Sequence, residues 1–340
     1  MARYPLPSRV GAAARALAHS RLWRAVLALV LVAGALGGWW LSSAGSTDYP
    51  KGGTSLATGG KRGVYDRYGQ LLQGQLAEAM PGVELRLDNS QGSVDNLERV
   101  TSGSDDFAMA TADAVADFTG PGRDRLRAIA RLYDDYLQLV VPADSPVTKA
   151  ADLRGLRVGV GQELSGVNLV TRRLLACAGL DPDHDIKPAM LGVAQAADQL
   201  RAGSVDAFFW SGGLPTTALT DLSEHFRIRV VPLGDLAENL HQVEGGGTDA
   251  YRAATIPENT YPNAEPKQSV STVAVPNLLV TRDDVDTDLV QGMTRAVIDS
   301  RDRIGAQVHA AQLVDLRTAV YTDPLPLHEG ARRYYRSVKP

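Results

Sequence analysis

Apolar positions along the chain follow two spacings, one typical of strands and one typical of helices. From residue 54 to residue 141, short apolar or alternating runs predict strands at 54–57, 83–87, 107–110, 129–132 and 137–141. Between them, apolar residues recur three or four positions apart, as in Tyr65, Tyr68, Leu72, Leu76 and Ala79, and in Val94, Leu97 and Val100. This alternation predicts an α/β protein with a mostly parallel sheet.

A second region repeats the same alternation. Its predicted strands are 156–160, 205–210 and 228–233, with helices through Val170 and Leu174 and around Ala197. Residues 240–270, rich in Gly, Asn and Pro, predict irregular structure, and the chain from Asp286 onward is expected to be largely helical.

Two apolar segments bracket this second region: YLQLVVPADSPV begins at residue 136 and VAVPNLLVTRDDV at residue 273. They predict an inner lobe inserted into an outer lobe, joined by two crossing strands. The expected boundaries are 54–141 and 273–340 for lobe 1, the latter with the C-terminal helices, and 142–272 for lobe 2. A hinge of two strands would let the lobes close over a ligand.

The N-terminal segment, residues 1–44, has five arginines and no acidic residue. After Arg24 follows the uncharged run AVLALVLVAGALGGWWL, which predicts an export signal with a cytoplasmic N-terminus. Small residues at 42–44 would allow cleavage as a signal peptide; the alternative is a signal anchor through residues 25–41. Residues 45–53 form a polar linker. In either case, the body is expected to be extracytoplasmic, either secreted or anchored in the membrane. No cysteine follows the apolar run, which excludes a lipoprotein.

Composition narrows the function classes. The net charge of the 340-residue chain is −4, and the part beyond the N-terminal segment carries 30 basic against 39 acidic residues. This balance argues against a nucleic-acid partner. Cys177 is the single cysteine, so the chain has neither an intrachain disulfide nor a thiolate metal cluster. The six histidines stand singly and no HExxH motif occurs, so no metal site is expected.

Four loops share one design: a strand ends, small residues follow, and a helix begins. They are 58–63, 89–93, 161–166 and 211–215. In open α/β sheets such loops line the crevice at the carboxyl ends of the strands. Glycine allows close backbone approach, and helix N-termini offer free N–H groups to anions. Any single loop could be no more than a turn. The four together predict a site for a small anion such as a carboxylate.

The expected ligand-binding residues come from both lobes. Lobe 1 would contribute Thr58, Gly59, Gly60, Tyr65, Asn89, Ser90 and Ser93. Lobe 2 would contribute Gln162, Ser165, Gly166, Gly212, Gly213 and Pro215. Asp113 would accept a hydrogen bond from an amino group of the ligand or, alternatively, only cap the helix that follows it.

Enzyme signatures are weak. There is no GxxxxGK[ST] loop, Ser165 lies in GQELSG rather than in a GxSxG elbow, and the glycines at 159, 161 and 166 do not have the dinucleotide-binding spacing. We therefore expect no enzyme, no catalytic residues and no cofactor. An exported α/β hydrolase stays as a remote alternative, because a site assembled from distant segments leaves no local motif.

Longer segments resemble the TAXI group of TRAP-transporter solute-binding proteins. The resemblance begins with LATGGKRGVYDRYGQLLQGQLAEAMPGVELRLDNSQGSVDNLERV and continues with DDFAMATADAV, ARLYDDYLQLVV, GLRVGVGQELSGV, VDAFFWSGGLPTTAL, IPENTYP, TVAVPNLLV and PLHEGARRYY. It spans roughly residues 54–335 in the order of the family. Two departures occur: the family usually has GTYYPLG where this chain has GVYDRYG, which keeps Tyr65, and it usually has Ser at the position of Ala112.

The resemblance implies a two-lobed type II periplasmic-binding-protein fold with two crossover hinge strands. It also implies a small carboxylate ligand, with glutamate, glutamine or a 2-oxo dicarboxylate as family precedents, delivered to TRAP membrane carrier subunits driven by an ion gradient. We expect a monomer. The alternative is a membrane-anchored ligand sensor that signals to a receptor histidine kinase.

Overall fold

The computed structural model describes residues 28–32, 34, 50–243, 247–261 and 263–338. The chain divides into two compact units, Met1–Asp48 and Tyr49–Pro340. In the first unit the described residues are helical. Among the described residues, no helix has the length and apolar character needed to cross a membrane. Most of the proposed signal or anchor at 1–44 lies outside the described residues.

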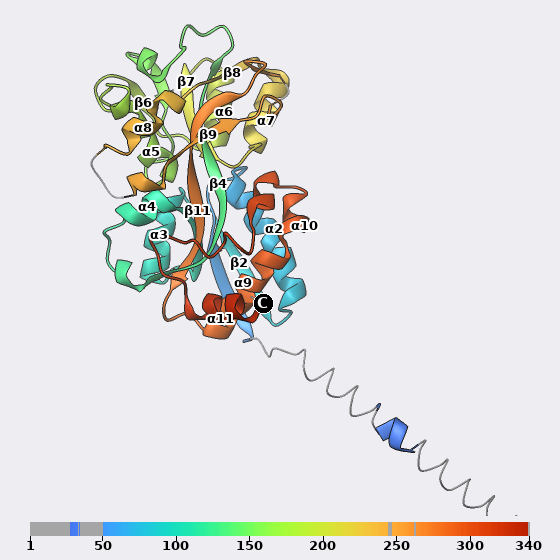
Figure 1. The fold of residues 1–340 in the computed structure, drawn as a ribbon. Coiled ribbons are helices and arrows are strands. Elements are labelled where there is room, and N and C mark those ends of the chain that lie inside the picture. Colours follow the sequence, from blue (N-terminus) through green and yellow to red (C-terminus); the bar gives the residue numbers. More distant parts are fainter. Residues whose placement is uncertain (1–27, 33, 35–49, 244–246, 262, 339–340) are drawn as a thin grey trace, which may run out of the picture. The chain divides into compact units, whose positions relative to one another are not determined.

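The second unit is built around one twisted sheet with the strand order β2-β1-β3-β11-β4-β7-β5-β6. Figure 1 shows its two lobes, with helices flanking the strands of each. Lobe 1 contains β1 (Gly52–Ala57), α2 (Val64–Ala79), β2 (Val83–Asp88), α3 (Ser93–Ser102), β3 (Phe107–Thr111), α4 (Ala112–Asp117), α9 (Thr287–Asp299), α10 (Arg301–Gly305) and α11 (Glu329–Val338). Lobe 2 contains β5 (Arg157–Gly159), α5 (Gly166–Cys177), β6 (Lys187–Ala189), α6 (Val193–Arg201), β7 (Ala207–Gly212), α7 (Thr217–His225), β8 (Ile228–Val231), α8 (Ala237–Leu240), β9 (Arg252–Ile256) and β10 (Ala264–Glu265).

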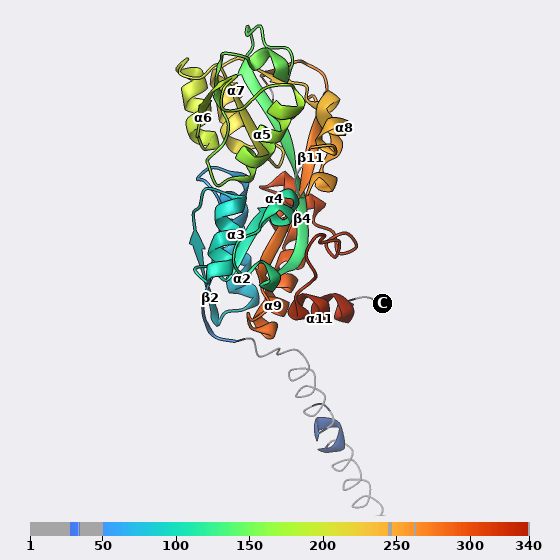
Figure 2. The ribbon, with the colours of Figure 1, turned by 90° about the vertical axis from the view of Figure 1, so that its left-hand side faces the viewer.

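Two long strands, β4 (Leu126–Pro142) and β11 (Val270–Arg282), run through both lobes (Figure 1). They pair antiparallel with each other, while β11 also pairs with β3 of lobe 1 and β9 of lobe 2. The later half of β4 pairs with β7 and β8. The α/β fold class with two crossover strands is therefore confirmed. Viewed from the side, α3 and α4 of lobe 1 lie next to α5 of lobe 2 (Figure 2).

The sequence predicted two strands, at 129–132 and 137–141, where the structure has the single strand β4. The separation was wrong, because the strand continues through Asp134 and Asp135, the polar residues between the two apolar runs. In the structure Asp134 pairs with Arg131 and Arg252, and Asp135 accepts a hydrogen bond from Asn277 of β11. Both carboxylates therefore have partners without any interruption of the strand.

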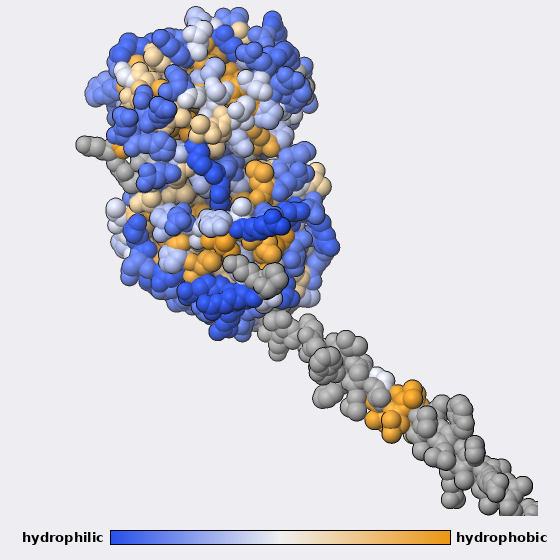
Figure 3. Space-filling model, in the orientation of Figure 1, coloured by the Kyte–Doolittle hydropathy of each residue, from blue (hydrophilic) through white to orange (hydrophobic). Residues whose placement is uncertain are grey.

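Each lobe has a core on both faces of its sheet. In lobe 1, Phe107 and Met109 pack on the side of α2, α9 and α11, while Ala108 and Ala110 pack on the side of α3 and α4. In lobe 2 the neighbours Phe208 and Phe209 likewise belong to different clusters. A strand covered on both faces is apolar without alternation, which explains the continuous runs in the sequence. The face shown in Figure 3 is largely hydrophilic.

The segment 240–270, expected to be irregular, contains the short strands β9 and β10. Each depends on a partner distant in sequence: β9 pairs with β11, and β10 pairs with β8. Short strands held by such pairing have little local signal, so the prediction of irregular structure was wrong for these residues.

Candidate functional site

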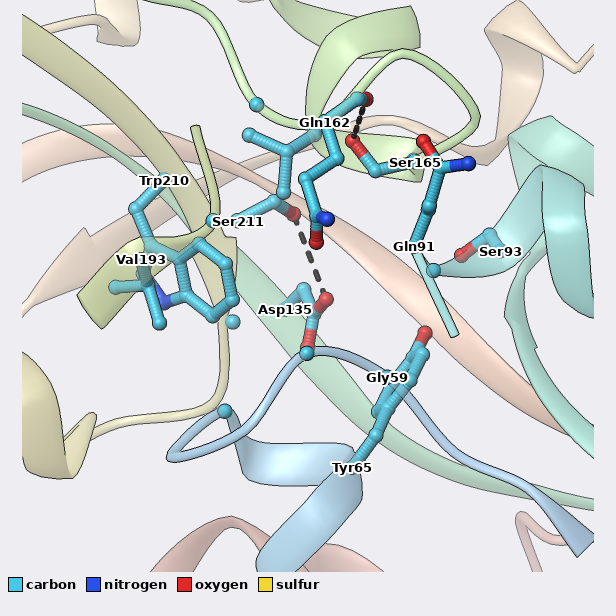
Figure 4. A pocket seen from close by; sticks show the side chains of 18 of the residues that line it. Gly59, Tyr65, Gln91, Ser93, Asp135, Gln162, Ser165, Val193, Trp210 and Ser211 are labelled. Carbon is cyan, nitrogen blue, oxygen red and sulfur yellow. Dashed lines mark hydrogen bonds between the residues drawn. The ribbon is translucent and has the colours of Figure 1, made fainter. Parts of the chain in front are cut away.

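A cavity of about 60 Å³ lies between the two lobes. One buried water needs about 10–15 Å³, so this space admits a small molecule. Lobe 1 and the crossing strand β4 line it with Gly59, Gly60, Gly63, Val64, Tyr65, Gln91, Gly92, Ser93, Thr111 and Asp135. Lobe 2 lines it with Gly161, Gln162, Ser165, Gly166, Val167, Leu191, Gly192, Val193, Trp210, Ser211 and Gly212. Figure 4 shows 18 of these residues around a common space.

Four helices begin at the wall of this cavity: α2 and α3 of lobe 1, and α5 and α6 of lobe 2. Their N-cap residues are Gly63, Gly92, Ser165 and Gly192, all of which line the cavity. Ser165 Oγ accepts a hydrogen bond from Asn168 N at 3.1 Å. The three glycine caps supply no side-chain acceptor to their helices. Helix N-termini carry N–H groups without intrahelical partners and a partial positive charge, so the cavity wall favours an anion, although at α3 the N–H groups of Val94 and Asp95 already donate to Leu164 O.

Eight of the residues expected from sequence line the cavity. They are Gly59, Gly60, Tyr65, Ser93, Gln162, Ser165, Gly166 and Gly212. Thr58, Asn89 and Ser90 lie behind the wall and shape its loops. Asn89 Nδ2 donates to Gly59 O at 3.0 Å, and Ser90 Oγ donates to Thr58 O at 3.2 Å. Gly213 and Pro215 also lie outside the lining residues.

Asp113 is not at the cavity wall, and its carboxylate is occupied by protein groups. Tyr251 Oη donates to Asp113 Oδ2 at 2.7 Å, and the backbone N of Ala114 donates to Oδ1 at 2.8 Å. Arg173 of α5 donates to Tyr251 Oη at 2.9 Å and to Asp117 Oδ2 at 2.6 Å. This buried network joins α4 of lobe 1 to α5 of lobe 2. A contact to a ligand amino group has no support at this position.

The sequence reasoning missed Asp135, Trp210 and the start of α6. Asp135 lies on β4 with only 4% of its surface exposed. Burial raises the pKa of its carboxyl to about 7. The nearby carboxylates of Asp134 and Asp113 also raise this pKa, whereas the hydrogen bond from Asn277 lowers it. The available signal was an acidic pair between two apolar runs, directly before the segment that was predicted to cross between the lobes.

The two lobes touch each other through backbone groups. Val94 N and Asp95 N, at the start of α3, donate to Leu164 O of lobe 2 at 3.1 and 3.0 Å. An ideal Cβ on Gly166 would lie 2.9 Å from Ser93 Oγ. The lobes are therefore in direct contact around the cavity, in a closed arrangement.

Among the described residues, no group of three or more His, Cys, Asp or Glu side chains could hold a metal ion. Cys177 is a half-buried free thiol on α5, and burial raises its pKa.

The chain is similar to known proteins both in sequence and in structure. The sequence model of the NMT1-like family matches residues 56–338. A structure from Bordetella bronchiseptica RB50 has 19% identity, covers 85% of this chain and 90% of its own, and has a TM-score of 0.50. The periplasmic aliphatic sulphonate binding protein of Escherichia coli has 17% identity, coverages of 86% and 84%, and a TM-score of 0.41. A putative L-cystine ABC transporter protein from Listeria monocytogenes has 14% identity, coverages of 77% and 98%, and a TM-score of 0.46.

Proposed function

The chain belongs to the NMT1-like family, and on this premise we propose that it is an extracytoplasmic solute-binding protein that captures a small carboxylate and delivers it to a membrane carrier. The observation that carries the proposal is the meeting of four helix N-termini, two from each lobe, at one cavity. No lysine or arginine is among the lining residues. The negative charge of the ligand would therefore be met by backbone N–H groups and helix dipoles.

The proposed binding residues are the expected ones that line the cavity. Lobe 1 would contribute Gly59, Gly60, Tyr65 and Ser93, and lobe 2 would contribute Gln162, Ser165, Gly166 and Gly212. Because each lobe supplies half of the site, a ligand gains all its contacts only when the lobes are together. Binding would therefore shift the population toward the closed arrangement.

The ligand class and the carrier type rest on the motif resemblance described above. It favours glutamate, glutamine or a 2-oxo dicarboxylate, and carrier subunits of the TRAP type. The lobe boundaries 54–141, 142–272 and 273–340 belong to the same proposal. No catalytic residue is assigned.

A melting-temperature screen of the full-length protein with amino acids and dicarboxylates tests ligand binding. A ligand at 100 times its Kd would stabilise the folded state by about 2.7 kcal/mol. Ser165→Trp would fill the cavity and abolish the shift, whereas Ser102→Trp, at the exposed end of α3, should preserve it. An unchanged melting temperature across the whole screen would overturn the proposal. Mass spectrometry of ligand released from freshly purified protein would identify the natural compound.

The carrier type is tested by uptake of the identified ligand into cells that express the protein and its carrier. Collapse of the ion gradient with a protonophore and a sodium ionophore should stop uptake while cellular ATP is held constant. Uptake that continues under these conditions would contradict the TRAP-type assignment while leaving the binding function intact.

A further inference from the structure

Asp135 is the single carboxylate among the residues that line the cavity, and none of those residues carries a cationic side chain. Its strand, β4, crosses between the lobes, and Asp135 lies among the side chains that line the cavity (Figure 4). Only 4% of the residue is exposed, so bulk water does little to solvate the charge.

The protein satisfies only part of the hydrogen-bonding capacity of this carboxylate. Asn277 Nδ2 donates to Asp135 Oδ1 at 2.7 Å, and Ser211 Oγ makes a longer contact with Oδ2 at 3.5 Å. An ionised carboxylate accepts about four hydrogen bonds, so about two positions stay open. Tyr65 donates its phenol hydrogen to Asn277 Oδ1, which fixes the amide with its NH₂ group toward Asp135. The carboxylate of Asp135 is thus positioned by β11 and β7 directly, and by α2 through Asn277.

Nearby cations are engaged elsewhere. Arg131 and Arg252 pair with Asp134, the residue before Asp135, and neighbouring side chains of a strand point to opposite faces of the sheet. Arg173 pairs with Asp117 and lies 3.9 Å from Asp113. A buried carboxylate without a cation is unfavourable, and a cationic group on a ligand would offset that cost.

We propose that Asp135 binds an ammonium group of the ligand, so that the site selects α-amino acids over dicarboxylates of the same size. The inference rests on the proposed function and deepens it. The carboxylate of the amino acid would face the helix N-termini, and its ammonium group would donate to the open positions on Asp135. A dicarboxylate lacks that donor and would bring a second negative charge close to Asp135.

The test uses isothermal titration calorimetry on the full-length protein. The twenty protein amino acids are titrated first, followed by the 2-oxo acid that matches each amino acid that binds, and by succinate and glutarate. A charged hydrogen bond corresponds to roughly a 10- to 150-fold difference in affinity. We expect the amino acid to bind more tightly than its 2-oxo counterpart by this factor. This comparison needs no variant.

Asp135→Asn keeps the size of the side chain and removes its charge. It should weaken amino-acid binding by the same factor and leave the 2-oxo acid unchanged or bound more tightly. Asp134→Asn is the matched control, because its carboxylate lies next in sequence but does not line the cavity. Because Asp134 helps to raise the pKa of Asp135, any change in the ratio of the two affinities should be in favour of the amino acid, opposite to the effect of Asp135→Asn. Circular dichroism of each variant checks that it is folded.

The pH dependence separates two roles of the carboxyl. If Asp135 accepts from an ammonium group, amino-acid affinity should rise as pH increases through 7, since only the ionised form attracts the cation. A protonated Asp135 that donates to the ligand would give the opposite trend. The other ionisable groups that influence it are Asp134 and Tyr133 on β4, Asp113 on α4, and Tyr65 on α2.

Equal binding of an amino acid and its 2-oxo acid would overturn the inference alone, and so would equal weakening of both by Asp135→Asn. Tight binding of dicarboxylates without any amino acid would also overturn it while supporting the proposed function. Binding of no compound would overturn the proposed function, and this inference with it.

Discussion

Gly166, the first residue of α5, is the position where a single methyl group should interfere with lobe closure. An ideal Cβ there would lie 2.9 Å from Ser93 Oγ and from Thr111 Oγ1, and 3.3 Å from Ser93 Cβ. All three atoms belong to lobe 1, whereas Gly166 belongs to lobe 2. The backbone of Gly166 is not in the left-handed region, so alanine fits α5 itself without strain. The clash therefore exists only when the lobes are together.

The expected loss of ligand affinity in Gly166→Ala can be estimated from these distances. A carbon 2.9 Å from two oxygens must retreat by a few tenths of an ångström, and overpacking of this kind costs about 1–3 kcal/mol. Because the cost falls on the closed arrangement, Gly166→Ala should weaken ligand binding by roughly 5- to 150-fold. Replacing glycine by alanine at a compatible position stabilises a fold by about 0.4–1 kcal/mol. The melting temperature without ligand should therefore not fall.

Calorimetric titration of the wild type, Gly166→Ala and Gly74→Ala measures this effect. Gly74 is an exposed residue of α2 whose added Cβ would meet nothing within 4 Å, so it controls for the chemical change. Small-angle X-ray scattering should show ligand-induced compaction in the wild type and in Gly74→Ala, but less in Gly166→Ala. Unchanged affinity in Gly166→Ala would mean that the added methyl group does not hinder closure. A lower melting temperature of the ligand-free variant would mean that the clash already exists without ligand, which would also contradict this prediction.

Three further outcomes follow from the charged groups. Arg173→Met leaves Asp113 buried without its nearby cation, so the free energy of unfolding in urea should fall by roughly 3–5 kcal/mol; a loss below 1 kcal/mol would contradict this. Arg62→Ala removes an exposed ion pair and should cost less than about 1 kcal/mol in the same assay. The pKa of Asp135 is raised from 3.8 to about 7 on folding, so the folded state binds its proton more tightly. Its contribution to stability is present below pH 4 and is lost as pH rises through 7. Asp135→Asn should therefore flatten the decline of unfolding free energy over this range, and parallel pH profiles would argue against it.

Much of the fold can be predicted from local sequence because its strands and helices have strong local patterns. The runs 107–110 and 137–141 are apolar without alternation, as expected for strands covered on both faces. Spacing of three or four marks the buried face of α2. The continuity of β4 could not be predicted in this way, because Asp134 and Asp135 are accommodated by Arg252 and Asn277, more than a hundred residues away.

Some residues of the candidate site likewise have a local sequence signal, whereas the roles of others depend on residues distant in sequence. Gly59, Ser93 and Gly166 were found from sequence because a loop between a strand and a helix is a local feature, and its position at the edge of a parallel sheet follows from the fold class. Asp113 follows an apolar run and Asp135 lies between two apolar runs, and the sequence offers no means of telling their roles apart. Asp113 meets Tyr251 and Arg173, whereas Asp135 meets Asn277 and Ser211 and faces the cavity.

The α/β alternation, the two crossing segments and the glycine-rich loops can thus be predicted from the chain alone, since each depends on residues close together in sequence. The folded arrangement of the two lobes is needed to show which carboxylate faces the cavity, that α6 also begins there, and how closely Gly166 approaches Ser93. Hydrogen bonds, desolvation and close contacts act over a few ångströms, and the packing of the two lobes sets those distances.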